Sequence, residues 1–464
     1  MSAPSRLPRV MQAASGMSIV DEMVDNVLVL GGGLAGAAAA HRLGDEGIAV
    51  TLVDRNDYQQ FQPLLYQVAT SQLPAEDIAR PHGAIFRKYP SVEVLTAEVA
   101  GVDLSDRVVR LSDGRTVTGS HLVLAAGARP NFFGVPGAAE HAFPLYSVAD
   151  AERLRRHLRR LLQDPGTPPD QDDGSLDVVV VGGGPTGVET AGALAELMDA
   201  LHATGRIDRP GQVTIVDRGS SLLAAFRGKS RRYALKRLTK AGVTPRLGIG
   251  VTAVHGDRVE FDDGTTIMAR TVVWGGGESG SEIVQGAGPK TGRGGRLDVL
   301  PDLTVDGYPG VYAVGDVANI PADDSTTLPQ LGSVAQQSGR WAAENILRER
   351  YEKGTEPFRY KDKGIMAMIG RNAAVAEVGK RRHQVDGPIA FAAWLGVHAM
   401  LLSGAHSKTD AFLSWGWDYF DRDHAATVEA STTPQRIAWG DDAADVPHIR
   451  VDDGSSPTAH DRAT

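Results

Sequence analysis

The sequence predicts an α/β protein with two tandem parallel-sheet domains and a C-terminal extension, and three observations indicate this fold. Two glycine-rich turns, Gly31-Gly-Gly-Leu-Ala-Gly36 and Gly182-Gly-Gly-Pro-Thr-Gly187, each follow an apolar run and precede a helical one. The segments around these turns repeat with an offset of about 150 residues. Glycine accounts for 54 of the 464 residues and clusters at such turns, which indicates backbone that approaches a ligand rather than disorder.

Each half repeats the same order of elements: strand, glycine turn, helix, strand ending in a carboxylate, hairpin and closing strand. The predicted strands are 26–30, 50–54 and 121–127 in the first half, and 177–181, 213–217 and 271–277 in the second. The hairpins carry Asp-Gly turns at Gly114 and Gly264, a dipeptide that favours chain reversal. Strands that alternate with helices predict two parallel sheets of the Rossmann type.

The repeats also set the domain boundaries that we expect. Val311-Tyr-Ala-Val-Gly-Asp316 returns to the first domain after the second repeat, while a helical stretch, 151–162, and a polar loop, 163–174, join the halves. The expected parts are a flexible N-terminal extension (1–25), a first domain (26–150 and 297–357), a second domain (151–296), a C-terminal domain (358–420) and a largely disordered tail (421–464).

Composition excludes several classes of function. The chain has no cysteine, which excludes disulfides, thiolate metal sites, iron–sulfur clusters and redox-active cysteine pairs, and we expect no metal site. A net charge of −9 argues against a nucleic-acid partner. No segment reaches the roughly 18–20 apolar residues of a spanning helix, and residues 1–26 lack the apolar core of a signal peptide.

Both glycine turns have the spacing of dinucleotide-binding fingerprints. In GxGxxG the first glycine allows a tight turn, the second lets the backbone approach a pyrophosphate, and the third lets helix and strand pack closely. The helix N-terminus attracts the phosphate charge. Asp54 follows Gly36 by roughly the 20 residues at which a carboxylate binds a ribose. We therefore expect two bound dinucleotides, with an unliganded glycine-rich turn as the alternative.

The second half carries two further carboxylates of interest. Asp217 ends the strand 213–217 and favours NADH, because a carboxylate accepts bonds from a free 2′-hydroxyl and repels a 2′-phosphate. Arg218 follows directly and could accommodate that phosphate, so NADPH stays open. Glu189 lies two residues beyond Gly187, where its position fits a functional carboxylate and a carboxylate that interacts with the helix dipole equally well.

Several segments resemble a known family. The two fingerprints, Val314-Gly-Asp316 and the lack of cysteine resemble the two-dinucleotide-binding flavoprotein reductases. Within them, the chain resembles the type II NADH:quinone oxidoreductases through three segments. These are Phe61-Gln-Pro-Leu-Leu-Tyr-Gln-Val-Ala-Thr70, Lys361-Asp-Lys-Gly-Ile-Met-Ala-Met-Ile-Gly-Arg-Asn-Ala-Ala-Val-Ala376, and the membrane-facing segment Ile389 to Phe420 with Trp394, Trp415, Trp417 and Tyr419.

The resemblance implies FAD as cofactor, hydride transfer from NADH, and electron transfer to a quinone of the menaquinone or ubiquinone type, in a respiratory chain and without proton pumping. It assigns FAD to Gly31, Gly33, Leu34, Ala35, Gly36, Asp54, Arg55, Gln67, Gly127, Gly315 and Asp316. It assigns NADH to Gly182, Gly184, Pro185, Thr186, Gly187, Asp217, Gly277 and Glu278. The implied quinone pocket holds Ser333, Gln336, Gln337, Lys363 and Met366, and Glu189 becomes the candidate catalytic residue at the nicotinamide–flavin junction.

Two positions depart from the family pattern. The family's Ala-Gln pair at the quinone end of the flavin aligns with Gly332-Ser333, so an expected glutamine is missing. Near the nicotinamide, Gly275-Gly-Gly-Glu278 stands in place of an Ala-Ala-Gly type of strand end, and Glu278 adds a carboxylate.

The apolar segment 389–402 raises the question of membrane contact. It follows Lys380-Arg-Arg-His383 and precedes the aromatic stretch 411–420, a combination typical of a protein that sits in one leaflet. We expect peripheral contact with the cytoplasmic side of the cell membrane, and a homodimer; a buried helical hairpin or a dimer contact are alternatives for this segment. Two rival functions stay open, a reductase of a soluble electron carrier or small molecule, and a flavin-binding redox sensor.

Overall fold

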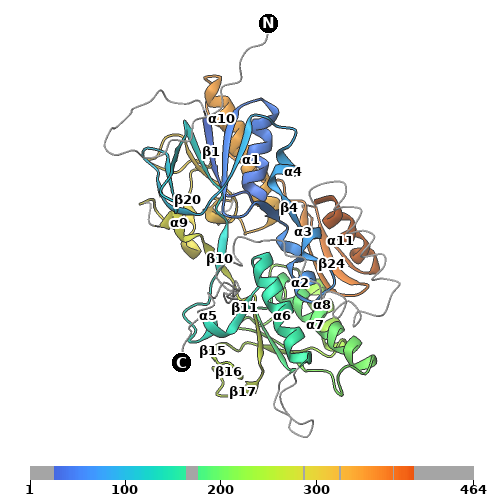
Figure 1. The fold of residues 1–464 in the computed structure, drawn as a ribbon. Helices are drawn as coiled ribbons and strands as arrows, with labels where there is room; N and C mark the ends of the chain where they lie inside the picture. The colour runs from blue at the N-terminus through green and yellow to red at the C-terminus, as the bar shows by residue number, and fades with distance from the viewer. Residues whose placement is uncertain (1–25, 164–175, 286–287, 323–325, 380, 402–464) are drawn as a thin grey trace, which may run out of the picture.

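The computed structural model describes residues 26–163, 176–285, 288–322, 326–379 and 381–401. In Figure 1 the first domain, with β1, α1 and α10, lies above the second domain, with α6, α7 and β15 to β17. The C-terminal region, with β24 and α11, lies beside both. The predicted N-terminal extension, the aromatic stretch 411–420 and the tail 421–464 lie outside the described residues, as does nearly all of the loop 163–174.

The first sheet is parallel and has the strand order β21-β9-β1-β2-β5. Its strands are β21 (Val311–Ala313), β9 (His121–Leu124), β1 (Asn26–Leu30), β2 (Ala49–Asp54) and β5 (Val92–Thr96). All five residues of β1 are buried, as expected for a central strand covered on both faces. The helices α1 (Leu34–Asp45) and α10 (Gly332–Arg350) pack closely against each other beside it.

The second sheet has the same arrangement, in the order β11-β18-β12-β13-β14. Its strands are β11 (Ala142–Pro144), β18 (Thr271–Trp274), β12 (Val178–Val181), β13 (Val213–Asp217) and β14 (Thr244–Leu247). The accompanying helices are α6 (Val148–Gln163), α7 (Pro185–Ala203) and α8 (Gly228–Lys240). The two sheets confirm the predicted α/β fold with tandem Rossmann-like domains.

A three-stranded meander accompanies each sheet, at the hairpins that the sequence predicts. The first holds β6 (Val99–Asp103), β7 (Val108–Leu111) and β8 (Thr116–Thr118), and the second holds β15 (Val251–Val254), β16 (Arg258–Phe261) and β17 (Thr266–Met268). Between the domains, β10 (Ala128–Pro130) pairs antiparallel with β19 (Glu278–Gly280), so each glycine-ended strand, β9 and β18, continues into this connection.

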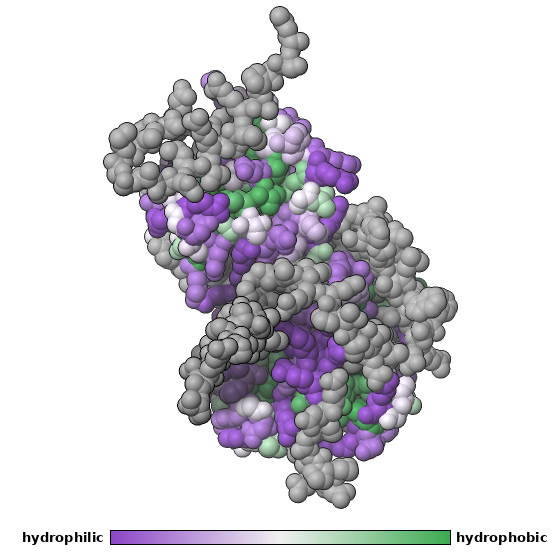
Figure 2. Space-filling view, viewed as in Figure 1, coloured by the Kyte–Doolittle hydropathy of each residue, from purple (hydrophilic) through white to green (hydrophobic). Residues whose placement is uncertain are grey.

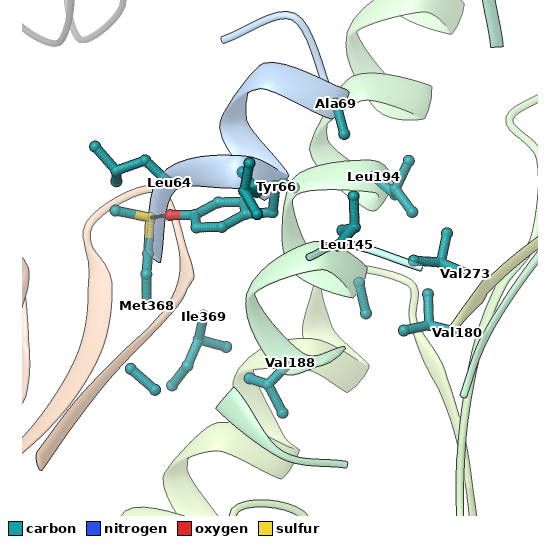
Figure 3. Packing of buried hydrophobic residues seen from close by; sticks show 14 of the residues in the cluster. Leu64, Tyr66, Ala69, Leu145, Val180, Val188, Leu194, Val273, Met368 and Ile369 are labelled. Carbon is teal, nitrogen blue, oxygen red and sulfur yellow. Dashed lines mark hydrogen bonds between the residues drawn. The ribbon is translucent and has the colours of Figure 1, made fainter. Parts of the chain in front are cut away.

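The C-terminal region is an antiparallel sheet of β23 (Gly364–Gly370), β24 (Ala373–Val378) and β25 (His383–Gly387), followed by α11 (Pro388–Leu401). It packs on α7, where Gly192 leaves room for Ile369: a Cβ at Gly192 would lie 2.0 Å from the Ile369 carbonyl oxygen. Figure 3 shows Met368 and Ile369 facing Tyr66 of α2 (Leu65–Ala69) and Val188 of α7. One hydrophobic core therefore joins three parts of the chain.

The remaining elements are short. The helices are α3 (Ala75–Ile78), α4 (His82–Phe86), α5 (Ala138–His141) and α9 (Glu282–Gln285), with single 3₁₀ turns at η1 (Gln62–Leu64), η2 (Arg293–Gly295) and η3 (Gly315–Val317). The strand pairs are β3 (Tyr58–Gln60) with β4 (Ala79–Pro81), and β20 (Leu297–Asp298) with β22 (Ala318–Asn319).

On the face seen in Figure 2, hydrophilic side chains predominate on both lobes and hydrophobic ones form separate patches. None of the described helices is both long and apolar enough to cross a membrane. The described ranges also contain no group of three or more histidine and carboxylate side chains placed to hold a metal ion.

Candidate functional site

The first glycine turn has the geometry of a phosphate-binding turn. Gly31 has φ +101°, and a Cβ there would lie 2.4 Å from the Ala125 carbonyl oxygen. A Cβ at Gly36 would lie 1.8 Å from the Gly31 carbonyl oxygen, so only glycine allows the helix to start this close to the strand. Gly33, by contrast, has nothing within 4 Å of its Cβ position and is the N-cap of α1, with no side chain capping the helix. An anion can therefore approach the open amide groups of this N-terminus.

The second glycine turn repeats this geometry position by position. Gly182 has φ +111°, and its Cβ would lie 2.2 Å from the Gly275 carbonyl oxygen. A Cβ at Gly187 would lie 1.8 Å from the Gly182 carbonyl oxygen, while Gly184, the N-cap of α7, again has open space around it. The chain thus builds two equivalent open helix N-termini.

The two predicted ribose carboxylates also make the same contacts. Asp54 accepts hydrogen bonds from the Gly32 amide at 2.5 Å and the Asn56 amide at 2.8 Å. Asp217 accepts them from the Gly183 amide at 2.5 Å and the Gly219 amide at 2.6 Å. These bonds fix each carboxylate against its own glycine turn.

Arg218, the alternative partner for a 2′-phosphate, contacts the segment that leads into β15. Its side chain lies beside Gly250, where a Cβ would be 2.6 Å from the Arg218 Nε and 2.8 Å from an Asp262 carboxylate oxygen. The Arg218 guanidinium thus lies next to Asp262 at the start of the second meander.

Both sheets reverse their strand order beside the central strand, between β1 and β9 and between β12 and β18. Ligands of open α/β sheets bind outside the carboxyl ends of the strands at such a switch point. Gly127 follows β9, and Gly277 follows β18, so both lie beside the crevices that the glycine turns border. Leu34 and Ala35 begin α1, and Pro185 and Thr186 begin α7, at the same two crevices.

The first crevice also receives the segment that returns after the second domain. Gly315 has φ +69°, and a Cβ there would lie 2.9 Å from the Ala35 Cβ. The Gly315 amide donates to the Ser338 hydroxyl at 3.0 Å, which holds the turn in place. Asp316 follows; its Oδ1 is buried and has no hydrogen-bond partner among the described residues. Burial raises the pKa of Asp316 to about 6, and the positive charge of Arg296 partly offsets this. A ligand hydroxyl could donate the hydrogen bond that Oδ1 lacks.

Glu278, which the resemblance assigns to NADH, begins β19 in the connection between the two domains. On β19 it stands opposite Pro130 of β10. Loss of hydration, together with repulsion from Asp316, raises the pKa of Glu278 to about 7. The hydroxyl of Tyr146 accepts a hydrogen bond from the Ala128 amide at 2.7 Å, and Arg55 acts electrostatically on this phenol. The structure therefore brings Arg55, Glu278 and Asp316 around Tyr146.

Glu189 is buried where α7 meets the C-terminal sheet. Its Oε1 accepts a hydrogen bond from the Met368 amide at 3.0 Å. Burial raises the pKa of Glu189 to about 8, while the Met368 amide and the Trp394 side chain partly offset this by favouring the charged form. The Tyr66 hydroxyl donates a hydrogen bond to the Met368 sulfur at 3.1 Å (Figure 3). It accepts one from the side-chain amide of Gln67 at 3.1 Å. Glu189 is therefore engaged with the C-terminal sheet rather than with its own helix terminus.

The predicted quinone residues divide into two groups. The Ser333 hydroxyl bonds the Tyr360 hydroxyl at 2.8 Å, and Gln336 is half-buried on α10. Gln337 bonds the Lys361 backbone twice, at 3.2 and 3.0 Å, so both polar atoms of its amide are occupied. In the C-terminal region, Met366 is partly buried on β23, and Lys363 is exposed beside it.

One prediction from the sequence is wrong: Trp394 does not face outward as a membrane-interface residue. Its side chain is 0% exposed and stacks on His398 at 3.9 Å between ring centres. The exposed face of α11 carries Ile389, Ala393 and Val397 instead. Because α11 is apolar on nearly every side, its sequence does not reveal which face the sheet covers.

Sequence reasoning missed three residues that hold the crevices in shape. These are Tyr146, which bonds the Ala128 amide beside Gly127, Ser338, which bonds the Gly315 amide, and Gln59, whose side-chain amide donates to the Gly33 carbonyl at 3.2 Å. None belongs to a glycine motif or directly follows a strand that the sequence predicts, so no spacing in the sequence indicates them.

The chain was compared with known proteins. The family model described as pyridine nucleotide-disulphide oxidoreductase matches residues 25–339. A type II NADH:quinone oxidoreductase of Mycobacterium tuberculosis, Ndh, is 35% identical over 84% of this chain and 87% of its own length. The type II NADH:quinone oxidoreductase of Staphylococcus aureus is 30% identical over 76% of this chain and 89% of its own length.

Solved structures share the fold at low identity. NDH2 from Plasmodium falciparum in complex with NADH has a TM-score of 0.77 at 17% identity, covering 86% of this chain and 99% of that one. The sulfide:quinone oxidoreductase from Aquifex aeolicus has a TM-score of 0.66 at 19% identity, covering 86% and 96%. Family match, curated relatives and fold agree with the resemblance read from the sequence, and the chain belongs to the type II NADH:quinone oxidoreductases of the pyridine nucleotide-disulphide oxidoreductase family.

Proposed function

We propose that the protein is an FAD-dependent NADH:quinone oxidoreductase, which takes a hydride from NADH and passes the electrons to a quinone. The observation that carries this proposal is the pair of matched glycine turns, each with an open helix N-terminus and a fixed carboxylate. Two such sites in one chain suit one flavin dinucleotide and one nicotinamide dinucleotide. Membership of a flavin-dependent family supports the same reaction.

We assign FAD to the first site, because there a third segment brings Asp316, a carboxyl whose Oδ1 has no hydrogen-bond donor among the described residues. FAD supplies the electron-accepting and electron-carrying chemistry. Gly33 admits the pyrophosphate, Asp54 accepts from the ribose, and Asp316 accepts from a ribityl hydroxyl. The other proposed contacts are Gly31, Leu34, Ala35, Gly36, Arg55, Gly127 and Gly315. The Gln67 side chain is 2% exposed and bonds Tyr66, so its contribution is to support Tyr66 beside the site.

We assign NADH to the second site, with Gly184 at the pyrophosphate and Asp217 at the adenosine ribose. The other proposed contacts are Gly182, Pro185, Thr186, Gly187, Gly277 and Glu278. Two observations support NADH over NADPH: Asp217 is fixed at its turn, and the Arg218 side chain already lies next to the carboxylate of Asp262. A 2′-phosphate would meet a carboxylate without the compensating cation.

Quinone reduction consumes two protons, and we propose that Glu189 supplies or relays one of them. A buried carboxyl with a pKa of about 8 holds its proton at neutral pH and can release it to a reduced acceptor nearby. Ser333, Gln336, Met366 and Lys363 line the proposed pocket for a menaquinone or ubiquinone. Gln337, which bonds Lys361, would shape the pocket by holding the start of the C-terminal region rather than by touching the quinone.

A lipid-soluble quinone requires access to the membrane, and we propose peripheral contact through the exposed face of α11, on the cytoplasmic side. Ile389 is 74% exposed and Val397 39%, and Ala393 lies between them one turn from each. Arg381 and His383 are exposed at the start of β25, where they can meet anionic lipid.

Ile389→Glu should weaken sedimentation with anionic liposomes, while Met268→Glu, a control in the second domain, should not. If the wild type does not bind liposomes and Ile389→Glu lowers its sedimentation coefficient in solution, this face instead belongs to the expected homodimer.

Steady-state consumption of NADH with a panel of acceptors tests the reaction. We expect a short-tailed quinone to sustain turnover far better than dioxygen or a soluble electron-carrier protein. Faster turnover with the carrier protein would favour the soluble-acceptor reductase, and slow turnover with every acceptor would favour the redox sensor.

A further inference from the structure

Phe133 combines two unfavourable features. Its φ is +52°, a left-handed conformation that a bulky residue rarely adopts and that costs free energy. Its side chain is 58% exposed, so the strain does not serve to bury the ring in the core. Strained residues persist only where their surroundings hold them, and they cluster at ligand-binding positions.

Four contacts hold the segment 131–133 in this conformation. The Phe133 amide donates to the Asn131 side-chain oxygen at 2.8 Å. The Asn131 amide donates to the Gly277 carbonyl at 3.0 Å, and the Trp274 indole N–H donates to the Asn131 carbonyl at 2.9 Å. The Phe132 ring packs on Trp274 at 5.5 Å between ring centres. The segment is thus attached at several points to the end of β18 and the glycines that follow it.

The attachment places the Phe133 ring at the second crevice. A Cβ at Gly277, which has φ +146°, would lie 2.9 Å from the Phe133 Cζ, so the edge of the ring lies against the Gly277 backbone. The same glycine run borders the fingerprint from its other end, because a Cβ at Gly182 would lie 2.2 Å from the Gly275 carbonyl oxygen. The exposed phenyl ring therefore stands at the rim of the switch point between β12 and β18, where a dinucleotide crosses the sheet.

We infer that Phe133 is a binding residue for the nicotinamide dinucleotide, whose exposed ring packs on the bound ligand at the rim of the second crevice. This inference rests on the proposed use of NADH. A phenyl ring that is already fixed by the segment 131–133 loses little conformational freedom on binding, and its contact with the ligand removes apolar surface from water. No glycine motif or strand end indicates this role, because Phe133 belongs to the connection between the two domains.

The test compares three variants of the FAD-loaded full-length protein. Phe133→Asn removes the ring and keeps the backbone, because asparagine adopts the left-handed conformation readily. Phe133→Tyr keeps the ring and should restore affinity. Met268→Asn removes another exposed apolar side chain of the second domain, 44% exposed on β17, and serves as the control.

Calorimetric titration of the oxidised protein with NAD⁺ gives the affinity, and the NADH dependence of flavin reduction gives a second reading of it. We expect Phe133→Asn to weaken both affinities roughly ten-fold, a typical effect of losing an aromatic contact to a nucleotide, with a smaller effect on the limiting rate. We also expect its thermal midpoint to hold or rise, because strain is released. Wild-type affinity in Phe133→Asn would overturn this inference alone. A wild type that neither binds NAD⁺ nor is reduced by NADH would overturn the proposed function and this inference together.

Discussion

Asp54 and Asp217 show how one local arrangement serves two sites. Each ends a strand and accepts two backbone N–H groups: that of the glycine between the first two fingerprint glycines, Gly32 or Gly183, and that of the residue two positions after the carboxylate. Each carboxylate is only partly buried and keeps free lone pairs that can accept from a ribose. The equivalence makes each residue a control for the other.

Asp217→Asn should narrow the preference for NADH over NADPH, because the repulsion of a 2′-phosphate disappears. We expect NADPH to gain roughly five- to fifty-fold relative to NADH, measured as the ratio of kcat/KM values. Asp54→Asn should leave that ratio unchanged and weaken the retention of flavin instead. A wild type that already prefers NADPH would contradict the role given to Asp217.

Glu189 should give the oxidative half-reaction its pH dependence. With a pKa of about 8 the carboxyl is protonated at pH 7, so reoxidation by quinone should be fast below about pH 8 and slow above it. Glu189→Gln should flatten this profile and lower the plateau rate, while flavin reduction by NADH changes less. If the wild type and Glu189→Gln show the same pH dependence of flavin reoxidation, Glu189 has a structural role only.

The same carboxyl should influence stability. Its folded pKa, about 8, lies above the usual 4.5, so the folded state holds the proton more tightly. This contribution to the free energy of unfolding is complete below about pH 4.5 and is lost as pH rises through 8. As the pH rises from 5 to 8.5, the thermal midpoint of the wild type should therefore fall relative to that of Glu189→Gln.

Among the elements, α11 shows where reasoning from sequence stops. The apolar run 389–402 predicts the bounds of this helix closely, because α11 spans residues 388–401. The sequence does not predict which face of α11 is buried, because both faces are apolar. In the structure Ala390 and Trp394 are buried, while Ile389 and Val397 are exposed. Only tertiary packing decides between faces of equal hydrophobicity.

Trp394→Phe should keep most of this packing and remove the indole N–H that favours the charged form of Glu189. We expect the pKa of Glu189 to rise further, which moves the pH midpoint of quinone-dependent reoxidation upward, and stability to fall by about 1–2 kcal/mol. Trp341→Phe, at a half-buried indole of α10 that donates to the Glu356 carbonyl, is the matched control. A midpoint that moves equally in both variants would speak against a link between α11 and Glu189.

The segment between α10 and β23 depends on Gln337. Gln337→Ala removes two hydrogen bonds to the Lys361 backbone and should cost about 1–2 kcal/mol of stability. Gln336→Ala, at a neighbouring half-buried position with no side-chain bond among the described residues, should cost less. Denaturant unfolding of the two variants measures the difference, and equal losses would show that the Lys361 contact contributes little.

For the whole molecule, the internal repeat made most of the fold predictable. Two fingerprints with the same following elements specify two parallel sheets, and the segment 311–316 indicates that the first sheet is completed after the second domain, where β21 joins it. The repeat does not predict the contacts between the two domains or those with the C-terminal sheet. The β10–β19 connection, Tyr146, and the contact of the C-terminal sheet with α7 depend on pairs of residues far apart in sequence. For the same reason Phe133 and Ser338 carry no signal in the sequence.

The central claim is that the two sites act in sequence, NADH reducing the flavin and a quinone reoxidising it. Anaerobic stopped-flow spectroscopy tests this in two mixes, following the absorbance of the bound flavin. The account predicts that NADH bleaches the flavin, and that mixing the reduced protein with a short-tailed quinone restores the oxidised spectrum at least as fast as steady-state turnover. A flavin that NADH does not bleach, or that bleaches and is not reoxidised by quinone on this timescale, would contradict the account.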